Sequence, residues 1–529
     1  MSVSIDKPNS DKIGKDEPSI HVPLFLSSVI FTLGLGILFS ISPKGSIQAI
    51  NQIKSFLMNS LGSVFLLVSL GIVFIVFFFA CSKIGNVKFG TETDKPEYST
   101  SSWLAMIFTG GCGSSMLYWG TIEWTYYFKG GAGNTPLFLA PGSPETAEWA
   151  MAYGLFHSGI TPWSFYALVA VCVAYVYYVR KVPVFRISEI CRPVLGKYTN
   201  GPIGQFFDYS YIFALLAGGA TSLTFIANMV NGFLFQLLDI QFSESVKILI
   251  IAVFALATAL IISTKLSDGL KKIANVNLYL LYGTVIFVIL IGPTQFLFDT
   301  TTSSLGILLT NFFRMSLWTD SIHADGFSQD WTIFYWAWWL IYAPTMGIFL
   351  AKISKGRTIR QTIFAILGAG SLGCWVLYLA FGNYGMFLEL NGIYAATTDI
   401  LNGTDGGLVL AKIFSFMPFQ WVLVPLMILL ILIFSLTSLV SGAYSLAAVT
   451  TLNLPENKEP ALWNRIFWSI LRPSLTIGFI YLNSLVALKN SAIIASVPCL
   501  ILIVIMVISM FKMLKEDKVI QSEVIIVKY

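Results

Sequence analysis

The chain has 529 residues, of which 56% are hydrophobic and only 11% are charged, and its formal net charge is +5. Soluble domains carry about 25% charged residues, so the composition excludes a soluble globular protein. It predicts an all-α polytopic membrane protein, because apolar runs long enough to cross about 30 Å of hydrocarbon recur from end to end. The small positive excess is typical of cytoplasmic loops and indicates no nucleic-acid partner.

Twelve transmembrane helices are expected, with boundaries accurate to about four residues. Residues 1–20 are polar and are expected to form a cytoplasmic N-terminal tail, and 513–529 a short cytoplasmic C-terminal tail. The less apolar segment 301–328 is expected to form an interfacial helix and loop, and 388–406 an external loop. The predicted spans are 23–42, 63–81, 102–128, 146–179, 204–238, 245–264, 270–297, 329–351, 358–386, 408–449, 461–484 and 489–512.

Lys and Arg predict the orientation of these spans. They gather in the loops after spans four, six and eight, whereas the loop 130–145, which follows span three, has none. Positively charged loops stay on the cytoplasmic side of a membrane. The even-numbered loops and both termini are therefore expected in the cytoplasm, in a multi-pass protein of the plasma (inner) membrane.

Two spans contain residues that weaken a helix. The third holds Thr109–Ser115, with glycine at 110, 111 and 113, and the eighth holds Ala343–Gly347, which includes Pro344. Glycine makes a helix easier to unwind and proline removes a backbone donor. Polar backbone freed in this way is tolerated in a bilayer only where it lines a cavity or binds a ligand. Close helix packing through small residues is the alternative explanation.

Two interruptions five spans apart favour the transport interpretation over packing. They are expected of two five-helix halves with opposite topology, whose broken helices meet at the membrane midplane and hold the substrate. Residues 101–300 would form the first half and 329–512 the second, and 21–100 would contribute two peripheral transmembrane helices and a cytoplasmic loop.

The eighth span also carries an aromatic stripe. Tyr335, Trp338, Trp339 and Tyr342 are spaced i, i+3, i+4 and i+7, so they share one helix face, and Trp331 extends this face by one turn. Core packing is one interpretation. Phenol and indole groups, however, bring polar hydrogens into the bilayer, where leucine or phenylalanine would pack equally well. A cage for a quaternary ammonium ion is the other interpretation, and span four adds Trp163 and Tyr166 to it.

Several segments together resemble the betaine/carnitine/choline transporter (BCCT) family, and the resemblance covers residues from about 20 to about 515. It implies a LeuT-like 5+5 inverted repeat in helices 3–12, alternating access and a homotrimer. The segments that carry it are Trp331–Trp339, Ala351–Arg357, Trp119–Glu123, Phe156–His157, Pro162–Trp163 and Gly269–Asn277.

The resemblance also implies roles for individual residues. Tyr126 and Tyr342 would help to enclose the substrate, and Trp331 and Tyr335 would lie on its approach. The residues expected to bind it are Trp163, Tyr166, Trp338, Trp339, Tyr342, Tyr126 and the glycine-rich segment Gly111, Cys112 and Gly113. One departure matters, because Ser158 stands where family members usually have a tryptophan of the cage. Losing one ring costs about 1–2 kcal/mol, so the substrate could equally be a zwitterion that is not trimethylated.

Two modes of coupling remain open. Similarity to sodium-coupled members implies a Na⁺ site formed by Thr109, Cys112, Phe434, Thr437 and Ser438. Asn277 supports this mode, because sodium-independent exchangers of carnitine and γ-butyrobetaine have an arginine there. Met346 supports exchange, because it matches a methionine that displaces a second sodium in those exchangers. The alternative for Thr437 and Ser438 is that their hydroxyls bond back to their own helix.

The sequence therefore predicts a secondary active transporter that imports a small quaternary-ammonium or related zwitterion of the glycine betaine, carnitine or choline type. Coupling to sodium is the favoured mode, and sodium-independent exchange of substrate against product is the alternative. No histidine or cysteine pattern indicates catalysis or a metal centre, so we expect neither an enzyme nor any cofactor besides the coupling ion.

Overall fold

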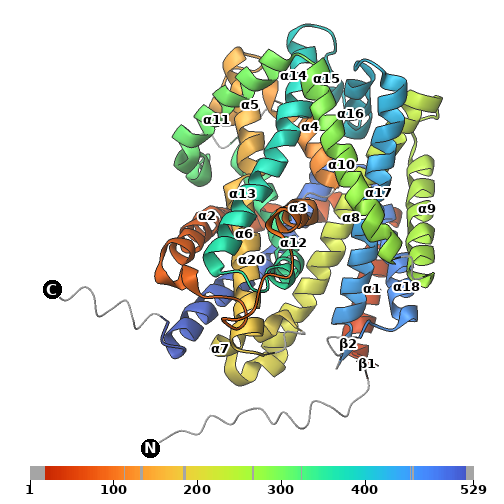
Figure 1. Cartoon of the computed structure of the whole chain (residues 1–529). Coiled ribbons are helices and arrows are strands. Elements are labelled where there is room, and N and C mark those ends of the chain that lie inside the picture. The colour runs from red at the N-terminus through yellow and green to blue at the C-terminus, as the bar shows by residue number, and fades with distance from the viewer. Residues whose placement is uncertain are drawn as a thin grey trace, which may run out of the picture.

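The structure is a computed structural model. It describes residues 18–111, 114–130, 135–182, 186–264, 267–322, 325–452, 454 and 458–519, with the side chains at 109–111, 114 and 267–275 excepted. Nearly all of these residues are helical, and the helices stand side by side in one elongated bundle (Figure 1). The predicted class, an all-α polytopic membrane protein, is confirmed.

The N-terminal part of the chain lies on the outside of the bundle. Strand β1 (Ser19–Ile20) pairs antiparallel with β2 (Thr451–Leu452), which joins the start of the described chain to the end of α17. Helices α1 (Val22–Ile41) and α2 (Pro43–Cys81) follow directly. Ser42 alone separates the two helices. Pro43 is the first residue of α2, a position at which the missing N–H of proline costs no helical hydrogen bond.

The first half of the remaining chain contains three long helices and several short ones. The α-helices are α3 (Thr100–Gly111), α4 (Ser114–Phe128), α5 (Pro144–His157), α6 (Ile160–Ala174), α7 (Arg192–Leu195), α8 (Pro202–Leu238), α9 (Glu244–Ser263) and α10 (Ser267–Ile291). Short 3₁₀ or π turns, named η, are η2 (Lys83–Asn86), η4 (Pro136–Phe138), η5 (Tyr175–Val179), η6 (Ile187–Cys191) and η7 (Gly196–Asn200).

The second half is divided in a similar way. Its elements are α11 (Thr294–Leu317), η8 (Ser328–Thr332), α12 (Ile333–Ile353), α13 (Ile359–Leu377), η9 (Tyr378–Gly382), α14 (Asn383–Leu390), α15 (Ala396–Leu401), α16 (Gly406–Ser415), α17 (Gln420–Val449), α18 (Leu462–Leu471), α19 (Pro473–Leu482) and α20 (Leu485–Glu516). Helix α11 occupies much of the segment expected to be interfacial, and it is bent by 106° from α10.

Among the described residues, nine helices are long and apolar enough to cross a membrane, or ten if the bent pair α10 and α11 counts as one span. The number twelve stays a prediction. Four predicted spans contain two α-helices each: 146–179 contains α5 and α6, 358–386 contains α13 and the start of α14, 408–449 contains α16 and α17, and 461–484 contains α18 and α19. The span 102–128 contains α3 and α4, and residues 112 and 113 between them are outside the described residues.

The expected interruption at Ala343–Gly347 is wrong, because α12 continues through Pro344 without a break. Gly347 has a packing role there. A Cβ at this position would lie 2.3 Å from Cγ1 of Val169, so the glycine lets α12 approach α6 closely. At the other expected interruption, α3 ends at Gly111 and α4 begins at Ser114, and Cys112 and Gly113 lie outside the described residues.

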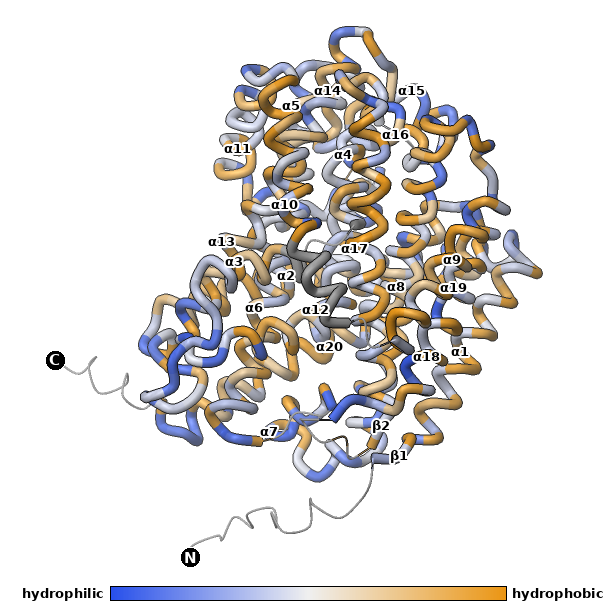
Figure 2. Tube along the Cα trace, turned by 45° about the vertical axis from the view of Figure 1, so that its right-hand side comes forward, coloured by the Kyte–Doolittle hydropathy of each residue, from blue (hydrophilic) through white to orange (hydrophobic). Residues whose placement is uncertain are grey.

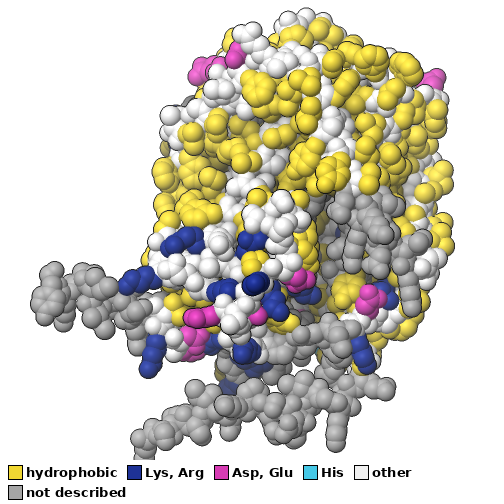
Figure 3. Space-filling view, viewed as in Figure 1, with side chains coloured by type: hydrophobic (Ala, Val, Ile, Leu, Met, Phe, Trp, Pro, Cys, Tyr) yellow, Lys and Arg dark blue, Asp and Glu magenta, His cyan; other side chains and the backbone are white. Residues whose placement is uncertain are grey.

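Helix α6 forms the centre of the bundle. Every residue from Thr161 to Ala174 is buried, whereas α1 and α9 each expose an apolar face. Apolar residues follow the helices throughout, and hydrophilic residues gather at the end that carries α7, β1 and β2 (Figure 2). On the face shown in Figure 3, Lys and Arg side chains lie at this same end, and hydrophobic side chains cover the upper part.

Candidate functional site

Helices α6 and α12 bring five predicted site residues into one aromatic cluster. The ring centres of Trp163 and Tyr166 lie 5.5 Å and 5.1 Å from that of Trp339. On α12, the Trp338 ring lies 6.4 Å from Trp339 and 6.2 Å from Tyr342. These five residues are called the α6 ring set below. Four of them are buried and Tyr342 is half-buried, so the predicted stripe faces the protein interior.

The indole N–H groups of this set distinguish it from ordinary core. Nε1 of Trp163, Trp338 and Trp339 is buried, and none of the three donates a hydrogen bond to any described residue. A buried donor without a partner costs roughly 1–3 kcal/mol, and most buried polar groups in proteins are satisfied. Three such donors beside five ring faces suit a ligand that carries both a hydrogen-bond acceptor and an apolar cation.

Neighbouring helices hold these rings in place. A Cβ on Gly370 of α13 would lie 2.1 Å from the Trp163 indole, so the glycine backbone packs directly on the ring. On α8, the Ser222 hydroxyl lies 2.7 Å from the Tyr342 hydroxyl. The ring planes are therefore fixed from two further sides.

A second cluster lies on α4, η8 and the start of α12. It consists of Trp119, Tyr126, Trp331 and Tyr335, and is called the α4 ring set below. The Trp331 ring lies 5.2 Å from Tyr126 and 6.1 Å from Trp119, and Trp119 lies 5.6 Å from Tyr335. Tyr335 is 6.3 Å from Trp338, which joins the two sets into one continuous aromatic path.

Lys489 of α20 was not among the predicted site residues, yet it contacts this path. Its Nζ lies 3.3 Å from the centre of the Trp331 ring and 5.5 Å from that of Phe334, and the residue is only 5% exposed. It forms no ion pair with any described residue, whereas Lys247 and Lys412, which also lie over aromatic rings, each pair with an aspartate. The available signal was a lysine at the start of the predicted span 489–512.

A fully buried polar network lies beside Tyr335. Oε1 of Glu123 accepts hydrogen bonds from the Tyr127 hydroxyl at 2.7 Å and from Nδ1 of His157 at 2.8 Å, and Oε2 accepts one from Tyr378. The His157 ring stacks on Tyr335 with centres 4.5 Å apart. The network joins α4, α5 and η9, and its three donors satisfy a carboxylate that has no contact with solvent.

Residues 23–519 match the sequence model of the betaine/carnitine/choline family of transporters (BCCT). The chain belongs to the BCCT family. It is 32% identical over 460 residues to a carnitine transporter of Acinetobacter baumannii, a match that covers 86% of this chain and 81% of the relative. It is 30% identical to a glycine betaine transporter of Bacillus subtilis, covering 94% and 95%. An ectoine/hydroxyectoine transporter of Virgibacillus pantothenticus is 32% identical, covering 84% and 87%.

The structure describes only some of the residues of the expected BCCT sodium site. Thr437 and Phe434 are half-buried and Ser438 is exposed on α17. The Thr437 hydroxyl donates a 2.8 Å hydrogen bond to the Phe434 carbonyl oxygen, as the alternative interpretation expects for Thr437. This bond uses the hydroxyl hydrogen and leaves lone pairs on both oxygens. Thr109 lies near the end of α3 but its side chain is outside the described residues, as is Cys112.

Three further positions bear on coupling and on the substrate. Asn277 is fully buried, and its Nδ2 donates a 3.3 Å hydrogen bond to the Leu430 carbonyl of α17. Met346 is half-buried on α12, one turn beyond Tyr342. Ser158 is buried, and its hydroxyl donates a 2.8 Å hydrogen bond to the Gly154 carbonyl oxygen in the last turn of α5.

Proposed function

We propose that this BCCT protein imports a small quaternary-ammonium compound or related zwitterion, of the glycine betaine, carnitine or choline type, by alternating access. The observation that carries the proposal is the α6 ring set, in which rings from two helices meet and three indole N–H groups have no described partner. Ring faces attract an alkylated cation by about 0.5–2 kcal/mol each. The N–H groups would donate to the substrate carboxylate.

The α4 ring set would form the approach to this site. Trp331 and Tyr126 contact each other, and Tyr335 connects them to Trp338. A cation moving along the path would exchange one ring face for the next, so no step would leave it without an aromatic partner. Among the described residues, the backbone at Gly111 lies at the end of α3, and the neighbouring Cys112 and Gly113 would complete the site.

The number of rings in the cage leaves two classes of substrate open in this proposal. The relatives named above are transporters of carnitine, glycine betaine and ectoine. Ser158 supplies no ring, and its hydroxyl already bonds to Gly154. A substrate without three methyl groups on nitrogen is therefore the alternative to a trimethylammonium compound.

We propose that import is coupled to sodium through Thr109, Cys112, Phe434, Thr437 and Ser438. Asn277 supports this mode because it carries no charge that could replace the ion. One sodium ion entering across about 100 mV and down a tenfold gradient supplies about 3.7 kcal/mol, enough for several-hundredfold accumulation of a neutral zwitterion. Sodium-independent exchange is the second candidate, and Met346 favours it.

We also propose the plasma membrane as the location, with both termini in the cytoplasm. The clustering of Lys and Arg at the end that carries β1 and α7 supports this orientation (Figure 3). The homotrimer implied by family resemblance is part of the same proposal.

Binding and uptake test the proposal in sequence. Thermal unfolding of the purified protein is measured with glycine betaine, carnitine, choline, γ-butyrobetaine, ectoine, proline and taurine, each with and without sodium. A ligand at a hundredfold excess over its Kd stabilises the protein by about 2.7 kcal/mol. Trp338→Ala should abolish this stabilisation, and Trp421→Ala, whose side chain is 73% exposed, should retain it.

Uptake into vesicles then separates the two modes of coupling. Loss of uptake when potassium replaces sodium supports symport. Unchanged uptake that requires internal substrate supports exchange. A full thermal response in Trp338→Ala, or no response to any of the zwitterions, would contradict the proposed site.

A further inference from the structure

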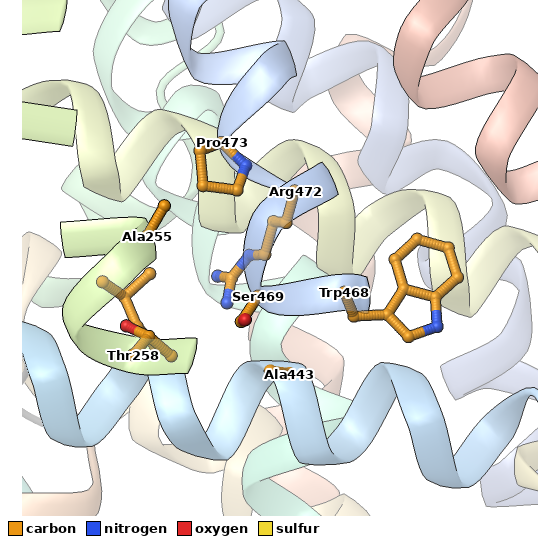
Figure 4. A pocket seen from close by; sticks show the side chains of 8 residues that line it. Ala255, Thr258, Ala443, Trp468, Ser469, Arg472 and Pro473 are labelled. Carbon is orange, nitrogen blue, oxygen red and sulfur yellow. The ribbon is translucent and has the colours of Figure 1, made fainter. Parts of the chain in front are cut away.

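Arg472 is a buried cation packed against helices α8, α9 and α17. It lies where α18 ends and α19 begins, and it is 8% exposed. Figure 4 shows its guanidinium pointing away from its own helix, beside Ser469 and toward the space between Thr258 and Ala443. The side chain therefore reaches into a region bounded by three other helices, α8, α9 and α17.

Two glycines make room for the guanidinium. A Cβ on Gly219 of α8 would lie 1.8 Å from Nη2, and a Cβ on Gly442 of α17 would lie 2.0 Å from Nη1. Any larger residue at either position would displace the charged group. Both helices are thus shaped to accept a guanidinium at this depth.

The charge of Arg472 has no counter-charge in the part of the chain that the structure describes. It forms no ion pair there, and Nε and Nη1, both buried, donate no hydrogen bond. By contrast, the buried Lys247 lies 3.3 Å from an Asp405 oxygen. A buried cation without a partner costs several kcal/mol, and charges within membrane proteins are paired or mark a site.

A small cavity adjoins the guanidinium. Its volume is about 10 Å³, and Thr258, Ser469 and Arg472 supply its polar lining, beside apolar residues such as Leu439 and Ala443. This is room for one particle about the size of a water molecule. The Thr258 and Ser469 hydroxyls already donate to Phe254 and Ile466 carbonyls, both at 2.7 Å. The donors left for a cavity ligand are therefore the guanidinium N–H groups.

We propose that this cavity binds one small inorganic monovalent anion, chloride being the natural candidate, beside the positively charged guanidinium of Arg472. A water molecule would satisfy the donors but would leave the charge uncompensated, whereas an anion does both. The volume excludes an organic carboxylate. Neutralising the guanidinium would stabilise the contact of α8 and α17 with the junction of α18 and α19.

Thermal unfolding of the full chain in detergent tests this site without any transport substrate. The melting temperature is measured in potassium chloride and in potassium gluconate at equal ionic strength. Wild type should melt about 2 °C or more higher in chloride, with a saturable dependence on concentration. Arg472→Gln should lose the difference between the two salts. Arg465→Gln is the matched control, because Arg465 lies in the same helix and pairs with Glu459 at 2.6 Å; it should keep the difference.

Two further measurements keep the test decisive if Arg472→Gln fails to fold. Gly442→Ala retains the arginine but places a methyl group against it, so the chloride concentration for half-maximal stabilisation should rise about tenfold. Crystals grown in bromide should show an anomalous peak beside the Arg472 guanidinium. Equal melting temperatures of wild type in both salts, a chloride effect that survives in Arg472→Gln, or a bromide map without that peak would each overturn the proposal.

Discussion

The ammonium nitrogen of Lys489 lies 3.3 Å from the centre of the Trp331 ring, on the aromatic path that leads to the α6 ring set. The chain therefore places one of its own cations on a ring face that the proposed substrate needs. A substrate cation at Trp331 has to compete with a tethered ammonium, and a substrate with a carboxylate can pair with the same ammonium.

The first prediction concerns this competition. Lys489→Met should free the Trp331 face and remove a like charge, so the apparent affinity for choline, a net cation, should rise about threefold to tenfold. The affinity for glycine betaine should change less, because its carboxylate loses a partner. Competition between choline and glycine betaine in an uptake assay measures the ratio of the two affinities.

Lys412→Met is the control for this substitution. Lys412 also lies over a ring, 4.5 Å from the centre of Tyr394, but it pairs with Asp399 away from the aromatic path. The Lys412→Met variant should keep the wild-type ratio of the affinity for choline to the affinity for glycine betaine. An unchanged ratio in Lys489→Met would show that Lys489 has no part in selecting the solute.

The second prediction tests how the Trp163 ring is positioned. Gly370→Ala puts a Cβ where the indole now lies, 2.1 Å away, and overpacking of this kind costs about 1–3 kcal/mol. Displacement of the ring should weaken substrate binding about tenfold, as measured by titration of the thermal shift. Gly368→Ala, in the same helix with nothing within 4 Å of the added Cβ, should bind as wild type does. Equal affinities in the two variants would contradict a binding role for Trp163.

The third prediction concerns the buried network around Glu123. Glu123→Gln replaces the carboxylate, which accepts three hydrogen bonds, by an amide. The amide nitrogen of glutamine cannot accept a hydrogen bond from the group that it faces, so the free energy of unfolding should fall by about 2–4 kcal/mol. The melting temperature should fall by several degrees. Glu148→Gln, on the exposed side of α5, should have little effect. If both variants have the melting temperature of wild type, the Glu123 carboxylate does not stabilise the contact between α4, α5 and η9.

The fourth prediction tests the proposed sodium site. Thr437→Ala removes one oxygen ligand, and the sodium concentration for half-maximal uptake should rise about tenfold while uptake at saturating sodium persists. Ser445→Ala, which removes a hydroxyl that bonds back to Ser441 in the same helix, should leave the sodium dependence unchanged. Sodium-independent uptake by both variants would favour exchange instead.

The shared aromatic face of α12 was predictable because its signal is local. Tyr335, Trp338, Trp339 and Tyr342 are separated by whole helical turns, so their shared face follows from the period of the helix alone. The same reasoning failed at Pro344. Whether a helix breaks at proline depends on its surroundings, and α12 continues through Pro344 while Gly347 packs closely on Val169.

Lys489 and Arg472 show what the sequence leaves undetermined. Arg472 is a charge inside the predicted span 461–484, and Lys489 is one at the start of the span 489–512, which was a usable signal. Their partners are a ring on another helix and a cavity between α9, α17 and α18, and such contacts depend on tertiary packing rather than on spacing along the chain. The division of 461–484 falls at Arg472 and Pro473, where the proline occupies the first position of α19.

The complete enclosure of α6 limits how a new solute could be accommodated. Because every side chain from Thr161 to Ala174 is covered by protein, added bulk on this helix has neither lipid nor water to expand into. Libraries designed to change selectivity should therefore introduce equal or smaller residues on α6 and reserve enlargements for the half-buried Tyr126 and Tyr342. Membrane thickness can influence Trp163 and Tyr166 only through the surrounding helices.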